Sequence, residues 1–214
     1  MTTAVADRKD IFKAIHRSQH CQRNWNLEQQ IPQEDIDLIL ESVTQCPSKQ
    51  NASFYKIHVL QDRKIIEDLH SLTKGFGIDE DTVTTNTQTL ANLVLVFETA
   101  NRTQHFNRLA QQYVDVKREV VYESVAGELD KDLHMAAGVA AGYANLTASL
   151  LGYATGCCAC FDPVEVNKLL ELEDNVLLIM GIGIAGNKPR RVHHLNDEIV
   201  FPTRKKQPVE VIYK

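Results

Sequence analysis

The longest pattern in the sequence is an uncharged stretch of mostly small residues from Met135 to Phe161. Its length invites a transmembrane interpretation, since about 20 apolar residues span a bilayer. Four glycines, many alanines and polar residues such as Asn145 and Ser149 argue against this, and no basic flank sets an orientation. We expect a soluble helix of small residues that is hidden on all sides, because Gly and Ala let neighbouring backbones approach closely. Such a helix would lie at the centre of the protein or of a dimer.

The rest of the chain alternates between helical and strand-like patterns. Apolar residues at helical spacing predict helices over residues 7–18, from Pro32 to the residue before Cys46, and over 62–72. Strands are predicted over residues 54–61, 92–98 and 176–185, and a short strand should precede a helix capped by Asp162. The polar residues 101–131 are expected to be helical with a mobile portion. Long helices between strands predict an α+β or α/β architecture in three layers.

Charge and cysteine content narrow the possible partners. The formal net charge of −5 over 214 residues leaves no basic surface for a nucleic acid. The first residues lack the charged-then-apolar pattern of a secretory signal. Five cysteines, an odd number, fit reduced thiols in a cytosolic protein better than a disulfide framework. The sequence therefore predicts a cytoplasmic protein with neither nucleic-acid nor membrane partners.

Two segments carry side chains that could recognise a ring or an anion. The loop from Cys46 to Asn51 joins a helix end to a strand start, and Asn51 offers a donor and acceptors to the imide edge of a flavin or pyrimidine. Ser48 and Lys49 add a hydroxyl and a charge. The segment His16–His20 supplies Arg, His and Ser side chains that can cradle a phosphate. Taken alone, a turn and a solvated helix end explain these segments more simply.

Further candidates lie near the C-terminal half. Arg204-Lys205-Lys206 is a possible anion clamp, although so short a run is usually a solvated surface. The glycines at 181, 183 and 186 are followed by Asn187-Lys188-Pro189 rather than by a helix, so a Rossmann site is rejected.

The pair Cys157-x-x-Cys160 has three interpretations. A redox dithiol would place an activated thiolate near the helix that Asp162 begins. A metal site would need Cys21, Cys46 or His20 to complete four ligands. In the favoured interpretation the cysteines are small, buried residues whose backbone N–H groups contact a ligand.

In combination, these motifs resemble the FMN-dependent nitroreductase family over nearly the whole chain. His16-Arg17-Ser18 matches the phosphate motif at the end of the family's first helix, and residues 46–55 match its next loop. Cys160-Phe161-Asp162 stands in place of a Gly-Phe-Asp-like turn, before a strand that ends in Met180-Gly181. Arg204 and Lys206 before Pro208 match a closing basic pair. No single motif is specific, and their common order carries the resemblance.

The resemblance implies a fold and an assembly. The fold would be α+β, a nitroreductase-like three-layer arrangement with a central mixed sheet flanked by helices, in an intertwined homodimer. One domain would cover residues 1–214, and its C-terminal segment, about 199–214, would extend over the partner subunit. The family builds its site across the two subunits.

The resemblance also implies a role for each motif. The FMN phosphate would be held by Arg17, Ser18, Arg204 and Lys206, with His16 where the family commonly has an arginine. The isoalloxazine would be reached from the other subunit by Pro47, Ser48, Lys49 and Asn51. Cys158, Ala159 and Cys160 would present backbone to the ring, with the Ala159 N–H directed at N5. His20, or alternatively Arg23, would bring positive charge to the pyrimidine edge, where it stabilises the reduced flavin.

The implied function is that of a cytosolic homodimeric FMN oxidoreductase. NADH or NADPH would deliver hydride to N5, leave, and be replaced by a small oxidant such as a nitroaromatic or quinone, in ping-pong order. No side chain is expected to act as a nucleophile, and no metal is expected. Two alternatives remain, namely a thiol redox or metal-binding protein centred on Cys157 and Cys160, and a flavin-binding protein without useful turnover.

Overall fold

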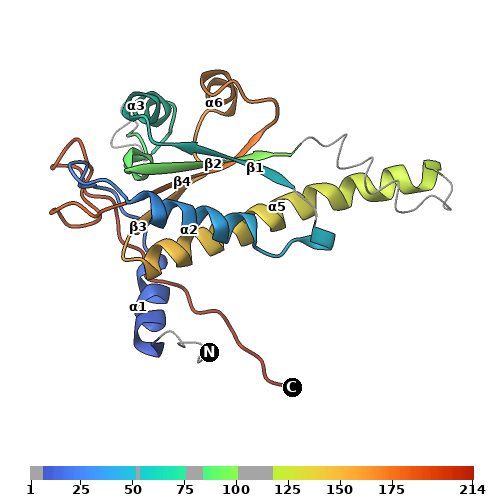
Figure 1. Cartoon of the computed structure of the whole chain (residues 1–214), viewed down its shortest axis with the longest axis horizontal. Coiled ribbons are helices and arrows are strands. Elements are labelled where there is room, and N and C mark those ends of the chain that lie inside the picture. The colour runs from blue at the N-terminus through green and yellow to red at the C-terminus, as the bar shows by residue number, and fades with distance from the viewer. Residues whose placement is uncertain (1–6, 52–53, 76–83, 101–117) are drawn as a thin grey trace.

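The protein folds into three layers, as the computed structural model shows (Figure 1). The structure describes residues 7–51, 54–75, 84–100 and 118–214, with the backbone alone for residues 50 and 118–130. A four-stranded sheet forms the middle layer, and helices cover both of its faces (Figure 1). The predicted α+β class and the three-layer arrangement are therefore confirmed.

The sheet has the strand order β1-β2-β4-β3. Its strands are β1 (Tyr55–Leu60), β2 (Leu93–Thr99), β3 (Ala154–Cys158) and β4 (Val176–Gly183). Each neighbouring pair of these four strands is antiparallel, so they do not form the mixed sheet implied by the resemblance. The reason is that the chain enters β2 at the end of the sheet where it leaves β1, with Leu60 paired to Val94, and such a return needs no crossover. The parallel pairing within the described residues is an isolated bridge from Cys21 to Thr155 in β3.

Four helices flank the sheet. One face is covered by α2 (Gln33–Thr44) and α5 (Arg118–Leu150), and the other by α3 (Arg63–Ser71) and α6 (Pro163–Leu169) (Figure 1). α1 (Arg8–Ser18) packs against α5. The apolar side chains of α2 predicted to point inward are buried at Ile36, Ile39 and Val43, where they join the alanines of α5 and the central strands in one core cluster. A second cluster joins α3 and α6 to the opposite face of the sheet.

Local signals set the helix ends as the sequence predicted. Asp7, Asp62 and Asp162 each accept a hydrogen bond from a backbone N–H in the first turn of the helix that follows. Such caps satisfy N–H groups that the helix itself leaves without a partner. α2 begins after Pro32 without a side-chain cap. The helices expected over 7–18, from Pro32 and over 62–72 are confirmed, as are the strands.

The uncharged stretch is divided between two elements. α5 ends at Leu150, Gly152 turns the chain with a φ of +97°, and β3 begins at Ala154. Within one chain this helix is not hidden on all sides, and burial in a dimer stays a prediction. Its alanines face the sheet, but a stripe of larger side chains is 36% to 55% exposed, namely Met135, Val139, Tyr143, Leu146 and Leu150. None of the helices in the described ranges has the length and hydropathy that a bilayer crossing needs.

Glycines in β3 and β4 let other segments lie directly on the sheet. A Cβ at Gly181 would collide with the backbone oxygen of Gln88 in η2 (Thr87–Leu90), and one at Gly156 would lie 2.5 Å from the Gln88 Cβ. Gly183 makes the same room for Trp25, whose ring lies 3.0 Å from the position of such a Cβ. The glycine-rich run at 181–186 therefore serves close packing, which agrees with the rejection of a Rossmann site.

The C-terminal segment leaves the body of the protein as an extended chain. Residues 202–214 are all exposed and form no strand pairing with the described residues. The exposed fractions of Val209, Val211, Ile212 and Tyr213 lie between 68% and 92%. This segment is thus extended but unpaired with the described residues of the same chain. Of the polar segment 101–131, residues 101–117 lie outside the described residues, and the remainder begins α5.

Candidate functional site

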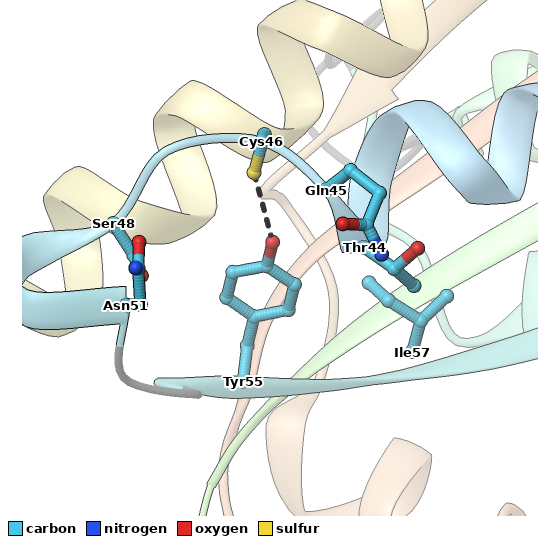
Figure 2. Close-up of a pocket in the computed structure, with 7 residues that line it drawn as sticks. All are labelled: Thr44, Gln45, Cys46, Ser48, Asn51, Tyr55 and Ile57. Atoms are coloured by element: carbon cyan, nitrogen blue, oxygen red, sulfur yellow. Dashed lines mark hydrogen bonds between the residues drawn. The ribbon is translucent and has the colours of Figure 1, made fainter.

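A cavity of about 600 Å³ opens beside the loop between α2 and β1 (Figure 2). It is lined by Thr44, Gln45, Cys46, Ser48, Asn51, Tyr55 and Ile57. Asn51 ends the short helix η1 (Lys49–Asn51) with a φ of +53°, which asparagine tolerates better than most residues. Two of the predicted ring-binding residues, Ser48 and Asn51, therefore face one cavity, whose volume suits a small-molecule site.

Tyr55 and Cys46 fix one wall of this cavity. The Tyr55 hydroxyl donates to the Val43 carbonyl oxygen at 2.7 Å and lies 3.1 Å from the Cys46 sulfur, as Figure 2 shows for the latter pair. Burial, with a contribution from the hydrogen bond to Cys46, raises the pKa of Tyr55. The phenol therefore stays protonated and ties β1 to the end of α2.

Lys49 makes its contact on α5 rather than in the cavity wall. Its Nζ lies 2.7 Å from the Asp132 carboxylate, whose side chain is 8% exposed. Pro47 is exposed on the same loop. Of the four residues predicted to reach a ring, Ser48 and Asn51 line the cavity, whereas Lys49 anchors the loop to the helix.

The predicted phosphate motif lies where α1 meets the C-terminal end of α5. Arg17 is exposed, and its Nη1 donates to the Ser149 carbonyl oxygen at 3.2 Å. A cation is favoured there by the helix dipole. The Ser18 hydroxyl donates to the Ile15 carbonyl oxygen at 2.8 Å, and the exposed His16 ring lies 4.4 Å from that of Phe12. All three residues lie at the end of α1, and two of them, His16 and Arg17, are exposed.

Further cations gather beside this motif. The pKa of His20 is lowered by burial and then by Arg190, Arg191 and His16. Arg191 is engaged in the fold, because its guanidinium donates to the carbonyl oxygens of Phe201 and Pro202. The Arg190 side chain forms no hydrogen bond or ion pair with the part of the chain that the structure describes. Sequence reasoning missed both arginines, whose only signal is their adjacency.

The most deeply buried of these cations is Arg23, which is 7% exposed. Its Nη1 donates to Asn86 Oδ1 at 3.0 Å, and its guanidinium lies 4.2 Å from the centre of the Phe201 ring. Its Nε has no hydrogen-bond partner among the described residues. Burial lowers the pKa of Arg23, and the neighbours that oppose this shift are thiols rather than carboxylates. A buried cation without a counter-charge is costly unless a ligand supplies one.

Asn86 connects Arg23 to the turn that follows β3. Its Nδ2 donates to the Cys158 sulfur at 3.3 Å and lies 3.5 Å from the Cys160 carbonyl oxygen. Cys158 is buried, whereas Ala159 and Cys160 are exposed. The exposed part of this turn therefore lies next to the buried guanidinium. The expectation that the cysteines are buried is wrong for Cys160, and the contact of their backbone N–H groups with a ligand stays a prediction.

The thiols themselves have the wrong chemistry for a redox dithiol. All five cysteines are free. Burial raises the pKa of Cys157 to about 12 and also raises that of Cys158, whereas thiolate chemistry needs a lowered pKa. Within the described ranges, no three His, Cys, Asp or Glu side chains are grouped so that they could hold a metal ion.

The predicted site residues of one chain form two groups at different positions along α5. Lys49 contacts this helix at Asp132, and Arg17 contacts it at Ser149. At 1.5 Å per residue, these contacts are about 26 Å apart along the axis. Arg204 and Lys206 lie in the exposed C-terminal segment and form no ion pair with any described residue. One chain alone therefore does not bring all of the predicted groups to a single ring.

Comparison with known proteins decides the family. A model of the nitroreductase family matches residues 17–184, which include the α1 end, the 46–51 loop, Arg23, Asn86 and the 158–160 turn.

The chain belongs to the nitroreductase family.

Solved structures of this family share the fold. A nitroreductase family protein from Streptococcus pneumoniae aligns with a TM-score of 0.61 at 19% identity, covering 90% of this chain and 100% of that chain. Nitroreductase A from Vibrio parahaemolyticus aligns with a TM-score of 0.62 at 18% identity, covering 94% and 78%. The NADPH:FMN oxidoreductase from Vibrio harveyi, solved with NAD+, has a TM-score of 0.61 at 18% identity, covering 94% and 80%. No curated protein matches the chain.

The resemblance to the nitroreductase family drawn from the order of the motifs is therefore confirmed. Sequence reasoning did not single out Asn86, which lies in a short polar run before β2 that has no hydrophobic pattern. It left the choice between His20 and Arg23 open. Of these two residues, Arg23 is the one that is buried beside the 158–160 turn, because Asn86 contacts both Arg23 and the Cys160 carbonyl oxygen.

Proposed function

We propose that this nitroreductase-family protein transfers hydride from NADH or NADPH to a small oxidant, such as a nitroaromatic or a quinone, in ping-pong order. When bound, FMN supplies the redox chemistry at its N5 atom, and the protein binds, orients and tunes it. The Vibrio harveyi neighbour, an NADPH:FMN oxidoreductase solved with NAD+, supports the choice of donor. The observation that carries the proposal is the buried guanidinium of Arg23 beside the exposed 158–160 turn.

The residues around Arg23 fit a planar, electron-accepting ring. The guanidinium has one hydrogen bond, to Asn86, and an Nε without a partner among the described residues. A carbonyl-rich ring edge that gains negative charge on reduction would be stabilised by such a cation. The adjacent turn offers backbone N–H groups at Ala159 and Cys160, and the Ala159 N–H is the proposed donor to N5. Arg23, rather than the outer His20, is the proposed cation at the pyrimidine edge.

The phosphate end is proposed to lie at the α1–α5 junction. Arg17 and Ser18 would bind the phosphate, with His16 beside them and Arg204 and Lys206 reaching it from the C-terminal segment. Arg17 already points one nitrogen at the Ser149 carbonyl oxygen. A guanidinium has five N–H donors, so this bond leaves others for a phosphate.

The rest of the site is proposed to come from a second copy of the chain. The open stripe on α5, together with Gly138 and Gly142, at which an added Cβ would meet nothing within 4 Å, offers a surface for close helix packing. Antiparallel pairing of two α5 helices about residue 140 would place Asp132 of one copy opposite Ser149 of the other. The loop 46–51 of one chain would then face the α1 end and the 158–160 turn of its partner, which one chain cannot achieve.

The C-terminal segment is proposed to complete this dimer. β1 is an edge strand of the sheet, with β2 on one side only. An open edge invites another strand, and the exposed residues 208–214 alternate apolar with polar side chains. We propose that the segment 199–214 extends over the partner subunit, so that residues 1–214 form one domain within an intertwined homodimer.

The assembly is tested by a charge placed on the open face of α5. Gly142→Arg should give a monomer by sedimentation and should lose FMN, because both halves of the site would be separated. Val164→Arg, at a 70% exposed position on α6, is the matched control and should remain dimeric with FMN. A dimeric Gly142→Arg variant would show that α5 is not the interface.

The chemistry is tested first by the visible absorption spectrum of the purified protein and by identification of any released chromophore. A flavin spectrum that yields FMN is expected. Steady-state rates at several donor and acceptor concentrations should then give parallel double-reciprocal lines. Intersecting lines would contradict the ping-pong order. A purified protein that is colourless and does not bind added FMN would contradict the proposed function itself.

A further inference from the structure

Three histidines that the proposed function does not use interact at the joint between α3 and the loop 186–201. His70, in the last turn of α3, is 7% exposed, and His193 of the loop is 6% exposed. His194 is half-buried beside it. The pKa of His70 is lowered to about 4 by burial and then by His193, Arg63 and His194. The three rings therefore lie within electrostatic range of one another.

The hydrogen bonds at this joint require uncharged rings. The Leu195 backbone N–H donates to His193 Nδ1 at 3.1 Å, and the Trp25 backbone N–H donates to His194 Nδ1 at 3.2 Å. A protonated imidazole carries hydrogen on both nitrogens and cannot accept either bond. The Nε2 atom of His70 is buried without a hydrogen-bond partner among the described residues. Protonation would thus break two backbone contacts and leave a charge without a partner.

The surroundings repel added positive charge. Burial lowers the pKa of His193, and His194 and Arg23 lower it further. Burial also lowers the pKa of His194, and Lys188 and Arg63 lower it further. Two of these cations have acidic partners of their own, because Arg63 pairs with Glu67 and Lys188 with Asp197. No carboxylate of the described chain offsets a charge on these rings in any of the three cases.

The same joint holds the loop against Arg23. The His193 ring stacks on Phe201 at 5.8 Å between centroids, and Phe201 lies over the Arg23 guanidinium at 4.2 Å. The Asn24 amide donates to the Pro189 carbonyl oxygen at 2.8 Å. Movement of His193 would therefore move the aromatic ring that covers Arg23.

We propose that His70, His193 and His194 form an acid-sensitive latch, which keeps the loop 186–201 closed over Arg23 while the rings are neutral and opens it when they take up protons. The direction follows from linkage. Burial lowers the pKa of each ring below the ordinary value of 6.5, so the open state binds more protons, and closure weakens as the pH falls below 6.5. Each ring contributes up to about tenfold per pH unit to the opening constant, and three together up to about a thousandfold.

The cofactor-free protein provides the test, so its outcome does not depend on whether FMN binds. Trp25 is the only tryptophan in the chain, and its backbone N–H donates to Nδ1 of His194. Its fluorescence should change as the pH is lowered from 7.5 to 4.5 while far-UV circular dichroism stays constant. The triple variant His70→Gln, His193→Gln and His194→Gln keeps amide acceptors that do not titrate, and it should lose this change. His134→Gln, at an exposed position on α5, should behave as the unaltered protein.

Three results would overturn the latch. The fluorescence could stay constant over this pH range, the triple variant could show the unaltered transition, or helical signal could be lost together with the fluorescence change. If the triple variant does not fold, histidine side-chain nitrogen NMR of the unaltered protein serves instead. His193 and His194 should be neutral with the proton on Nε2 at pH 7.5, and should protonate over the range in which the Trp25 amide signal moves. Titration of these rings without movement of that signal would contradict the proposal.

Discussion

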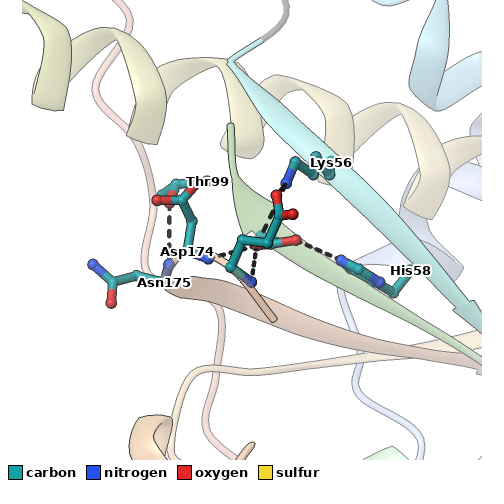
Figure 3. Close-up of polar contacts among 7 residues, drawn as sticks. Lys56, His58, Thr99, Asp174 and Asn175 are labelled. Carbon is teal, nitrogen blue, oxygen red and sulfur yellow. Dashed lines mark hydrogen bonds and ion pairs between the residues drawn. The ribbon is translucent and has the colours of Figure 1, made fainter. Parts of the chain in front are cut away.

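Two buried charged side chains, Glu98 and Arg23, differ in how many hydrogen-bonding and charged partners the fold provides for them. Glu98 in β2 is 1% exposed, and both of its carboxylate oxygens have protein partners. Figure 3 labels three of the surrounding residues, Lys56, His58 and Asp174. His58 Nε2 lies 2.6 Å from one oxygen, and the backbone N–H groups of Glu173 and Asp174 donate to the other at 3.0 and 2.6 Å. Lys56 Nζ lies 3.8 Å away and adds a positive charge. Glu98 thus holds β1, β2 and the loop before β4 together.

Arg23 is nearly as buried but has only a fraction of these partners. It has one side-chain hydrogen bond, to Asn86, and an aromatic ring over its guanidinium. Its Nε lacks a partner, and no carboxylate of the described chain influences its pKa. A charge that is fully satisfied from within stabilises the fold, whereas a charge left without its counter-ion at an exposed turn suits a ligand.

The largest expected effect is on folding stability when Glu98 is removed. Glu98→Ala leaves His58 and two backbone N–H groups without their acceptor, and should lower the free energy of unfolding by about 3–5 kcal/mol. Urea denaturation measures this difference. Glu173→Ala is the control, because the Glu173 side chain is 76% exposed in its pair with Lys56, and it should cost about 1 kcal/mol or less. A similar loss in the free energy of unfolding of both variants would contradict the structural role of the buried Glu98 carboxylate.

The corresponding change at Arg23 should affect binding instead. Arg23→Met keeps the aliphatic stem and removes the charge, so the affinity for FMN should fall by about ten- to hundredfold, or about 1.5–3 kcal/mol. The free energy of unfolding of the cofactor-free protein should change by only about 1 kcal/mol. Fluorescence titration with FMN and urea denaturation measure the two effects, with Arg8→Met on the exposed start of α1 as the control. Unaltered FMN affinity would remove Arg23 from the site.

The pH dependence of stability should sharpen the contrast further. Burial alone would raise the pKa of Glu98, but hydrogen bonds from His58 and the Asp174 N–H, with Lys56 nearby, lower it below the ordinary value of 4.5. Its contribution to stability is therefore complete above pH 4.5 and is lost as the pH falls through the lowered pKa. Below pH 4.5 the unaltered protein should lose up to about 1.4 kcal/mol per pH unit more than Glu98→Gln does. Equal acid slopes in urea denaturation would contradict this.

The smallest expected effect concerns the thiols near Arg23. If a thiolate supplied the missing counter-charge, replacing Cys160 would weaken the site. Burial raises the pKa of Cys157 and of Cys158, so neither favours a thiolate. Cys160 is proposed to contact the ring through its backbone, which serine keeps. Cys160→Ser and Cys157→Ser should therefore each change FMN affinity by less than about threefold, or about 0.7 kcal/mol. Loss of bound FMN in the variant that combines Cys157→Ser with Cys160→Ser would contradict this prediction and would favour the thiol redox interpretation.

Elements and motifs were predictable where the signal is local. Asp62 caps α3 through the Ile65 N–H, and Asp162 caps α6 through the N–H groups of Val164 and Glu165. Such bonds join residues two or three positions apart, so they are visible in the sequence. The order of the family motifs was visible for the same reason, because each occupies one short segment.

The site was predictable only in part. The sequence indicated the 46–51 loop, but Ser48 and Asn51 line its cavity while Lys49 binds Asp132 on α5, a partner 83 residues away. It also indicated a helix hidden on all sides, because the run of small residues shows no charged face. In the folded chain, only the alanines of α5 face the sheet, and the larger side chains between them stay open.

By itself, the sequence determined most of the helices and strands, though not the bounds of α5, and the family to which the chain belongs, because these signals depend on neighbouring residues. The tertiary structure alone decided which charges are satisfied. Arg23 meets Asn86 across 63 positions, and Glu98 meets His58 across 40. Nothing near either residue in the sequence distinguishes a structural charge from one kept for a ligand, because that difference lies in partners that only packing brings together.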